Sequence, residues 1–204
     1  MLDAIKHGLS HVITFDGRDA RQAFWYYVLF LYLVTMALSM VFVMPLMFQS
    51  MMTVVQQGIA QGQAQGQDPA AAQAAVQAAM MNSMSDLMPQ IVWMGVITGI
   101  GMLLMLAAAF VRRLHDSGLS GLWALVPAAC QAVSMATMPS QLAQMQRAMQ
   151  SADLNNPAAG MLMMRGSMGA GQLLAWVAIG VVVALGVRKP TPGPNRFGEA
   201  PFIA

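Results

Sequence analysis

Four long apolar stretches without a charged side chain constrain this chain more than any other feature. A helix rises about 1.5 Å per residue, so roughly 20 residues cross a hydrocarbon core of about 30 Å. Lipid cannot satisfy free backbone N–H and C=O groups, so a chain crosses it as helices or as a closed barrel, and runs of this length are typical of helices. We therefore predict an all-α fold, an integral membrane four-helix bundle. Its spans are residues 24–46, 91–111, 119–138 and 168–187.

The low content of charged residues supports the membrane assignment. Only 9% of the chain is charged, against about 25% in soluble domains, which is too little to coat a water-exposed surface. No basic stripe with interleaved aromatic residues is present, so nucleic acid is excluded as a partner. Cys130 is the single cysteine and lies in an apolar stretch, which excludes an intrachain disulfide and a cysteine metal site. No cofactor is predicted.

The distribution of basic residues predicts the orientation. Cytoplasmic loops carry an excess of Lys and Arg. With a cytoplasmic N-terminus, only Arg147 and Arg165 lie on the opposite side. The other eight of the ten basic residues are cytoplasmic: Lys6, Arg18, Arg21, Arg112, Arg113, Arg188, Lys189 and Arg196. Both termini are therefore predicted to be cytoplasmic.

The spans divide residues 1–204, a single membrane domain, into alternating segments. On the cytoplasmic side are segment 1–23, hairpin 112–118 and tail 188–204, and on the other side are 47–90 and 139–167. In the first segment the apolar residues fall on one helical face, which predicts an N-terminal interfacial amphipathic helix. These residues are Leu2, Ile5, Leu9, Val12 and Ile13.

The two outer segments are rich in Gln, Ala and Met. Asp68 and Pro69 are a typical start of a helix, the first as cap and the second at the first helical position. Residues 140–151 have a second helical pattern before the break at Asn155–Pro157. We predict short extracytoplasmic helices near the membrane in both segments.

The hairpin between the second and third spans has the most recognisable motif. Residues 112–118 read Arg-Arg-Leu-His-Asp-Ser-Gly, followed by Ser120, Gly121 and Trp123. Ser117-Gly118 supplies a turn and Ser120 a cap for the next helix. Two further motifs are Phe15-Asp16-Gly17-Arg18, followed by Arg21, Phe24 and Trp25, and Pro192–Gly198 in the tail. Together these elements resemble the bacterial inner-membrane family called domain of unknown function 805.

The resemblance implies a four-helix protein of the bacterial inner (plasma) membrane, and it supplies no established activity, cofactor or catalytic residue. All three matching motifs fall on the predicted cytoplasmic side. We hypothesise that their polar residues form one cluster that joins both termini to the hairpin and binds anionic lipid headgroups or a partner. The candidate residues are Asp16, Arg18, Arg21, Arg112, Arg113, His115, Asp116, Asn195 and Arg196, with Asp19 beside them.

Three groups of residues suggest alternative chemical functions. A carboxylate can orient a histidine for acid–base catalysis, but no Ser or Cys nucleophile motif accompanies His115 and Asp116, so we expect no enzyme. Asp3, His7 and His11 share a helical face without a fourth metal ligand, which favours a surface helix. Outer methionines provide soft ligands for Cu(I), although Met is also an adaptable packing residue. They are Met80, Met81, Met84, Met88, Met145, Met149, Met161, Met163 and Met164.

Small and polar residues within the spans leave the assembly open. Gly95 and Gly99 form a G-x-x-x-G pair, which favours helix packing within the bundle or in a homo-oligomer. We expect a structural, scaffold or accessory membrane protein. Its expected partners are the lipid bilayer and another membrane protein. The alternative is a small-solute transporter or oligomeric channel lined by Thr98, Gln131 and Ser134. Ionisable residues, which mark most ion pathways, are absent from the predicted spans.

Overall fold

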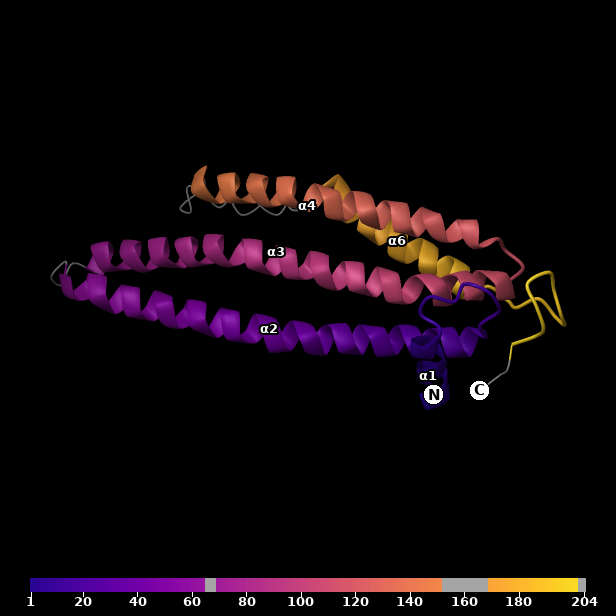
Figure 1. The fold of residues 1–204 in the computed structure, drawn as a ribbon. Coiled ribbons are helices and arrows are strands. Elements are labelled where there is room, and N and C mark those ends of the chain that lie inside the picture. The colour runs from indigo at the N-terminus through magenta and orange to yellow at the C-terminus, as the bar shows by residue number, and fades with distance from the viewer. Residues whose placement is uncertain (65–68, 152–168, 202–204) are drawn as a thin grey trace. The chain divides into compact units, whose positions relative to one another are not determined.

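Long helices make up most of the described chain (Figure 1). The structure, a computed structural model, describes residues 1–64, 69–151 and 169–201. Only an isolated bridge between Asn195 and Gly198 has strand-type pairing within these ranges. The elements in chain order are α1 (Leu2–Ser10), α2 (Arg21–Ala64), α3 (Pro69–Asp116), the 3₁₀ helix η1 (Gly121–Ala124), α4 (Leu125–Ser151) and α6 (Ala170–Gly186).

Within the described ranges, three helical stretches are long and apolar enough to cross a membrane. They are Arg21–Ala60, Gln73–Asp116 and Gly121–Arg147. Helix α6 is apolar but has 17 residues, which gives it a length of about 25 Å. The all-α membrane bundle is thus confirmed, while the fourth crossing and the membrane boundaries of the spans stay predictions.

The outer segments differ from the sequence prediction of short separate helices. Helix α2 continues through Pro45 to Ala64, α3 begins at Pro69, and α4 runs through Pro139 to Ser151. The helical start at Pro69 is confirmed, and Asp68 lies outside the described residues. Gln, Ala and Met all have high helix propensity, which favours continuation of helices that the apolar spans have already started, even through Gly58 and Gly62 of α2.

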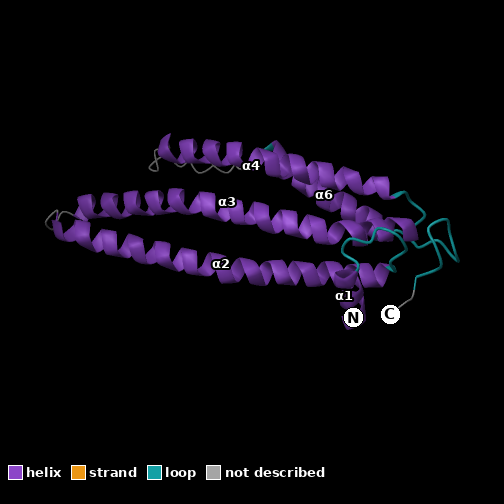
Figure 2. Cartoon of the chain, in the orientation of Figure 1, coloured by secondary structure: helices purple, strands orange, loops and turns teal. Residues whose placement is uncertain are grey.

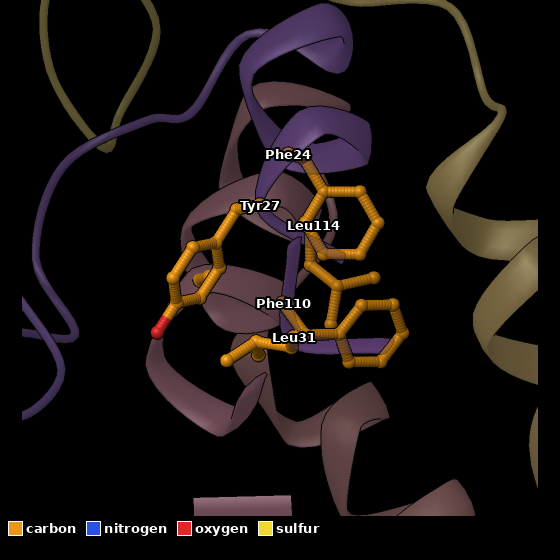
Figure 3. Packing of buried hydrophobic residues seen from close by; sticks show 6 residues of the cluster. Phe24, Tyr27, Leu31, Phe110 and Leu114 are labelled. Atoms are coloured by element: carbon orange, nitrogen blue, oxygen red, sulfur yellow. The ribbon is translucent and has the colours of Figure 1, made fainter. Parts of the chain in front are cut away.

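The chain forms two compact units. The first contains Met1–Thr35, Val96–Met138 and Met168–Ala204, and the second contains Met36–Gly95 and Pro139–Ser167. In the first unit, α2 and α3 pack through a buried cluster whose side chains interlock (Figure 3). Its members are Phe24, Tyr27, Leu31, Ala109, Phe110 and Leu114. The α2 members recur at intervals of three and four residues, and Leu114 follows Phe110 by four, which places them on one face of each helix.

Helix α1 packs on the first unit through its smallest residues. Ala4 and Gly8 are buried, and a Cβ at Gly8 would lie 2.4 Å from the Tyr27 ring. The predicted apolar face points away from this contact, since Leu2 is 70% exposed and Leu9 43% exposed. The predicted helix at the N-terminus is confirmed, and its position on a membrane surface stays a prediction.

The described part of the second unit combines buried apolar residues with contacts between its helices. Ala79 and Leu87 are buried hydrophobic residues there. The Gln146 side chain donates a hydrogen bond to the Ser85 carbonyl at 3.4 Å. A Cβ at Gly58 of α2 would lie 3.0 Å from the tip of Val76 in α3, so these helices approach closely at that point.

Candidate functional site

Three loops and the C-terminal end of α3 meet in the first unit (Figure 2). The loops are residues 11–20, 117–120 and the tail after α6. Gly17, Gly118 and Gly193 turn the chain with φ of 95°, 75° and 72°, a region that favours glycine. These turns bring the three sequence motifs together around five buried ionic residues, which we call the arginine network. Its members are Arg18, Asp19, Arg112, Arg113 and Asp116.

Asp116 is the centre of the network. Its Oδ1 accepts hydrogen bonds from Nη2 of Arg18 at 3.0 Å and Nε at 3.3 Å, and its Oδ2 accepts one from Nη1 of Arg113. The Asp116 side chain is completely buried, so both oxygens depend on these arginines. Its backbone carbonyl also accepts hydrogen bonds from the backbone N–H of Thr191 at 2.8 Å and its hydroxyl at 3.0 Å.

Arg18 connects the N-terminal loop to the C-terminal tail. Its Nη1 donates to the Gly193 carbonyl at 2.7 Å, and its Nη2 donates to the Thr191 carbonyl at 2.9 Å. Together with the pair to Asp116, these bonds engage every nitrogen of the guanidinium. A planar fork of donors suits several acceptors at once, which a lysine ammonium would match poorly.

Arg113 caps the C-terminal end of α6. Its Nε donates to the Gly186 carbonyl at 3.0 Å, and its Nη2 donates to the Arg188 carbonyl. The last carbonyls of a helix lack intrahelical partners and carry partial negative charge, so a buried guanidinium there supplies both hydrogen bonds and charge. Arg113 thereby fixes the end of an apolar helix to the end of α3.

Arg112 holds the loop before α2. Its Nε donates to Oδ2 of Asp19 at 3.0 Å, and its Nη1 donates to the carbonyls of His11 (2.7 Å) and Thr14. Oδ1 of Asp19 lies 3.1 Å from Nε2 of His7, which ties α1 to the same carboxylate. Nη2 of Arg112 has no hydrogen-bond partner within the described part of the chain.

His115 is enclosed by both terminal segments. Its ring stacks on Phe197 at a centroid distance of 3.9 Å, and its Nδ1 lies 3.3 Å from the Gly17 carbonyl. The guanidinium carbon Cζ of Arg196 lies over the Phe197 ring, 4.6 Å from the ring centroid. Asn195 donates to the His115 carbonyl at 2.9 Å and thereby holds the turn that presents Phe197.

Burial governs the electrostatics of this region. It lowers the pKa of Arg113, and the negative charge of Asp116 opposes that effect. Burial also lowers the pKa of His115, opposed by the Gly17 carbonyl, so the imidazole is neutral at pH 7. Two buried arginines share the one carboxylate of Asp116, and the remaining charge is stabilised by backbone carbonyls. Such a charge is costly to bury without these partners.

The structure brings most of the predicted cluster together but not all of it. Arg18, Arg112, Arg113 and Asp116 are buried, and His115 and Asn195 are half-buried beside them. Asp16, Arg21 and Arg196 are exposed, and Arg196 contacts the Phe197 ring. The prediction did not include Thr191 or the Gly186 carbonyl, because a backbone acceptor leaves no signal in a side-chain pattern.

The metal alternatives gain no support from the described geometry. His7 and His11 lie close together with ring centroids 4.3 Å apart, but no group of three potential His, Cys, Asp or Glu ligands occurs among the described residues. Met80 is exposed and Met81 and Met88 are half-buried on α3, while Met145 is exposed on α4. The other predicted Met ligands have side chains outside the described residues: Met84, Met149, Met161, Met163 and Met164.

The predicted packing and pore residues lie in different surroundings. A Cβ at Gly99 would lie 2.5 Å from Cε of Met135, so Gly99 contacts α4 closely, whereas a Cβ at Gly95 would have no such close approach to the described part of another helix. Ser134 is buried, and Thr98 and Gln131 are half-buried. Their role in a pore stays a prediction.

One comparison with known proteins identifies the chain's relatives. A family model described as protein of unknown function (DUF805) matches residues 12–199. No curated protein and no solved structure matches the chain. The match covers most of the chain and includes all five residues of the arginine network. The chain therefore belongs to the DUF805 family.

Proposed function

We propose that this DUF805 protein is a non-catalytic scaffold or accessory component of a bacterial inner membrane, with the arginine network on the cytoplasmic side. In this role the network holds α1, the end of α3 and the C-terminal tail in one fixed arrangement that other membrane components recognise. The observation that carries the proposal is the complete use of the guanidinium nitrogens of Arg18 and Arg113.

The hydrogen-bond donors of Arg18 and Arg113 are already engaged within the protein, which favours a structural role over a catalytic one. A catalytic group needs a free face toward its substrate, whereas these arginines donate to Asp116 and to backbone carbonyls. The hydroxyl of Ser117, which belongs to the hairpin motif, donates a hydrogen bond to the Leu114 carbonyl at 3.0 Å. His115 is stacked on Phe197 and its Nδ1 lies near the Gly17 carbonyl, so one ring nitrogen and the stacked face of the imidazole are engaged.

The proposal is tested by affinity purification of the tagged full-length protein in mild detergent. We expect a stoichiometric partner that is lost with Asp116→Asn, because that change disturbs the network. Asp16 belongs to the same predicted cluster but is exposed, so Asp16→Asn is a matched control and should retain the partner. Equal recovery with both variants would contradict the proposal.

A flux assay separates this role from transport. The purified protein is placed in liposomes, and leakage of ions and small neutral solutes is compared with protein-free liposomes. We expect no solute-specific flux. A saturable flux that one solute shows and its close analogue does not would replace the scaffold role with a transport role.

A further inference from the structure

We propose that a cavity beside the arginine network binds a phosphoryl group, that of an anionic lipid headgroup. The cavity has a volume of about 610 Å³ and lies within the first unit. Its lining includes the start of α2, with Arg21 and Gln22, and the tail from Lys189 to Gly193. A space of this size is typical of sites for small ligands.

Most of the charged side chains that line this cavity are cationic. The lining includes three basic side chains, Arg18, Arg21 and Lys189, and a single carboxylate, that of Asp116. Both oxygens of Asp116 are already held by Arg18 and Arg113, so this carboxylate cannot neutralise the two outer cations. The balance of charge therefore favours an anion.

Arg21 and Lys189 are the groups that would contact the ligand. Both are exposed, and neither has an ion pair within the described ranges. Arginine matches phosphate oxygens with two parallel hydrogen bonds, and lysine adds a mobile point charge. Arg18 is different, because its nitrogens are engaged with Asp116 and the tail, so it shapes the cavity floor.

The position along α2 favours a lipid over a free anion. Arg21 precedes Phe24, the first residue of the charge-free apolar stretch, by three residues, or about 4.5 Å of helix. Aromatic residues such as Trp25 prefer the headgroup level. A cation one turn before that level lies where headgroup phosphates are concentrated. The first turn of α2 also has no acidic residue that would repel them.

The test is native mass spectrometry of the purified full-length protein in detergent, titrated with phosphatidylglycerol or phosphatidylcholine of matched chains. We expect the anionic lipid to bind about tenfold more tightly. The double variant Arg21→Gln/Lys189→Gln should lose that preference. Lys6→Gln/Arg188→Gln removes the same charge from exposed positions that do not line the cavity, and should keep it. Equal loss in both double variants, or no preference in the unaltered protein, would overturn the proposal.

Inorganic phosphate as competitor distinguishes the sources of the anion. Displacement of the lipid by inorganic phosphate would show that the phosphoryl group alone is recognised, and resistance would show that the whole headgroup is needed. Both results support the site. If the double variant fails to give folded protein by circular dichroism, the single variants are measured, each with an expected loss of about threefold. This readout needs no protein partner, so it can fail or succeed independently of the scaffold role.

Discussion

The two compact units of this protein reach their structures by different means. The first unit buries charged residues, and each arginine of the arginine network donates to groups far away in the sequence, such as Arg18 to Asp116 and to Gly193. In its described part, the second unit buries small or aliphatic residues such as Ala79 and Leu87, on helices rich in Gln, Ala and Met. Directional contacts specify one arrangement, whereas uniform apolar contacts allow several of similar energy. We therefore expect substitutions to have large effects in the first unit and small ones in the second.

Removal of the central carboxylate should have the largest effect. Asp116→Asn leaves Arg18 and Arg113 buried without a countercharge, and the loss of one partner of a buried ion pair costs about 3–5 kcal/mol. The free energy of unfolding is measured by titration with SDS in mixed micelles, followed by circular dichroism. The second unit offers a matched control, since Asp86 is exposed and Asp86→Asn should change stability by less than about 0.5 kcal/mol. Equal effects of the two changes would remove the distinction between the units.

A larger side chain beneath α1 should have the next largest effect. Gly8→Val places carbon atoms against the Tyr27 ring, which lies 2.4 Å from the position of a Cβ. Overpacking of this kind costs about 1–3 kcal/mol, and displacement of α1 is the simplest relief. Hydrogen exchange of residues 2–10 should become faster, while exchange in α6 stays unchanged. Unaltered exchange in α1 would show that the Tyr27 ring moves instead.

The same type of change in the second unit should be close to neutral. Gly58→Ala brings a Cβ within 3.0 Å of the Val76 methyl, which is the end of a side chain. Alanine gains up to about 1 kcal/mol over glycine within a helix, and this offsets the small shift of Val76. The expected change in unfolding free energy is under about 1 kcal/mol in the SDS titration. A loss as large as that of Gly8→Val would show that the second unit is packed as specifically as the first.

The smallest expected effect is a pH dependence of the first unit. The pKa of His115 is below its ordinary value of about 6.5 in the folded chain, because of burial. At pH values above the ordinary pKa of about 6.5, the imidazole is mostly neutral in both the folded and the unfolded chain. As the pH falls below it, the unfolded chain takes up the proton first, so the free energy of unfolding decreases. The groups that face the ring are the Gly17 carbonyl, Asp16, Arg196 and Phe197.

His115→Gln isolates this contribution. Unfolding curves of the variant and the unaltered protein are compared between pH 7 and pH 5, and the variant should lose less stability over that interval. Other groups, including the His7–Asp19 pair, contribute equally to both curves. Parallel curves would show that protonation of His115 is not linked to folding.

Local patterns in the sequence predicted much of the fold. The charge-free stretches predicted apolar helices, Pro69 marked the start of α3, and Gly118 adopts the positive φ expected of the turn. Ser120 caps η1 by accepting a hydrogen bond from the Leu122 N–H. These features depend on residues close in sequence, where propensity and turn chemistry act directly.

The continuous outer helices and the acceptors of the arginines were not predictable in this way. The sequence predicted spans that end at residues 46 and 138 and short separate helices beyond them, but α2 continues through Pro45 and α4 through Pro139. For Arg113 the sequence shows a charged side chain, while its partners are the carbonyls of Gly186 and Arg188, more than 70 residues away. Every residue has a carbonyl, so only tertiary structure reveals which ones an arginine selects.

The cap that Arg113 places on α6 has a consequence for how the protein assembles. Arg113 emerges from the ribosome long before Gly186 and Arg188 exist, so its Nε and Nη2 lack their native acceptors until the last helix has been synthesised. Docking of α6 against α3 and completion of the hydrogen bonds of a charged residue are therefore the same event. A chain truncated before residue 186 would retain an incompletely paired guanidinium at the end of α3.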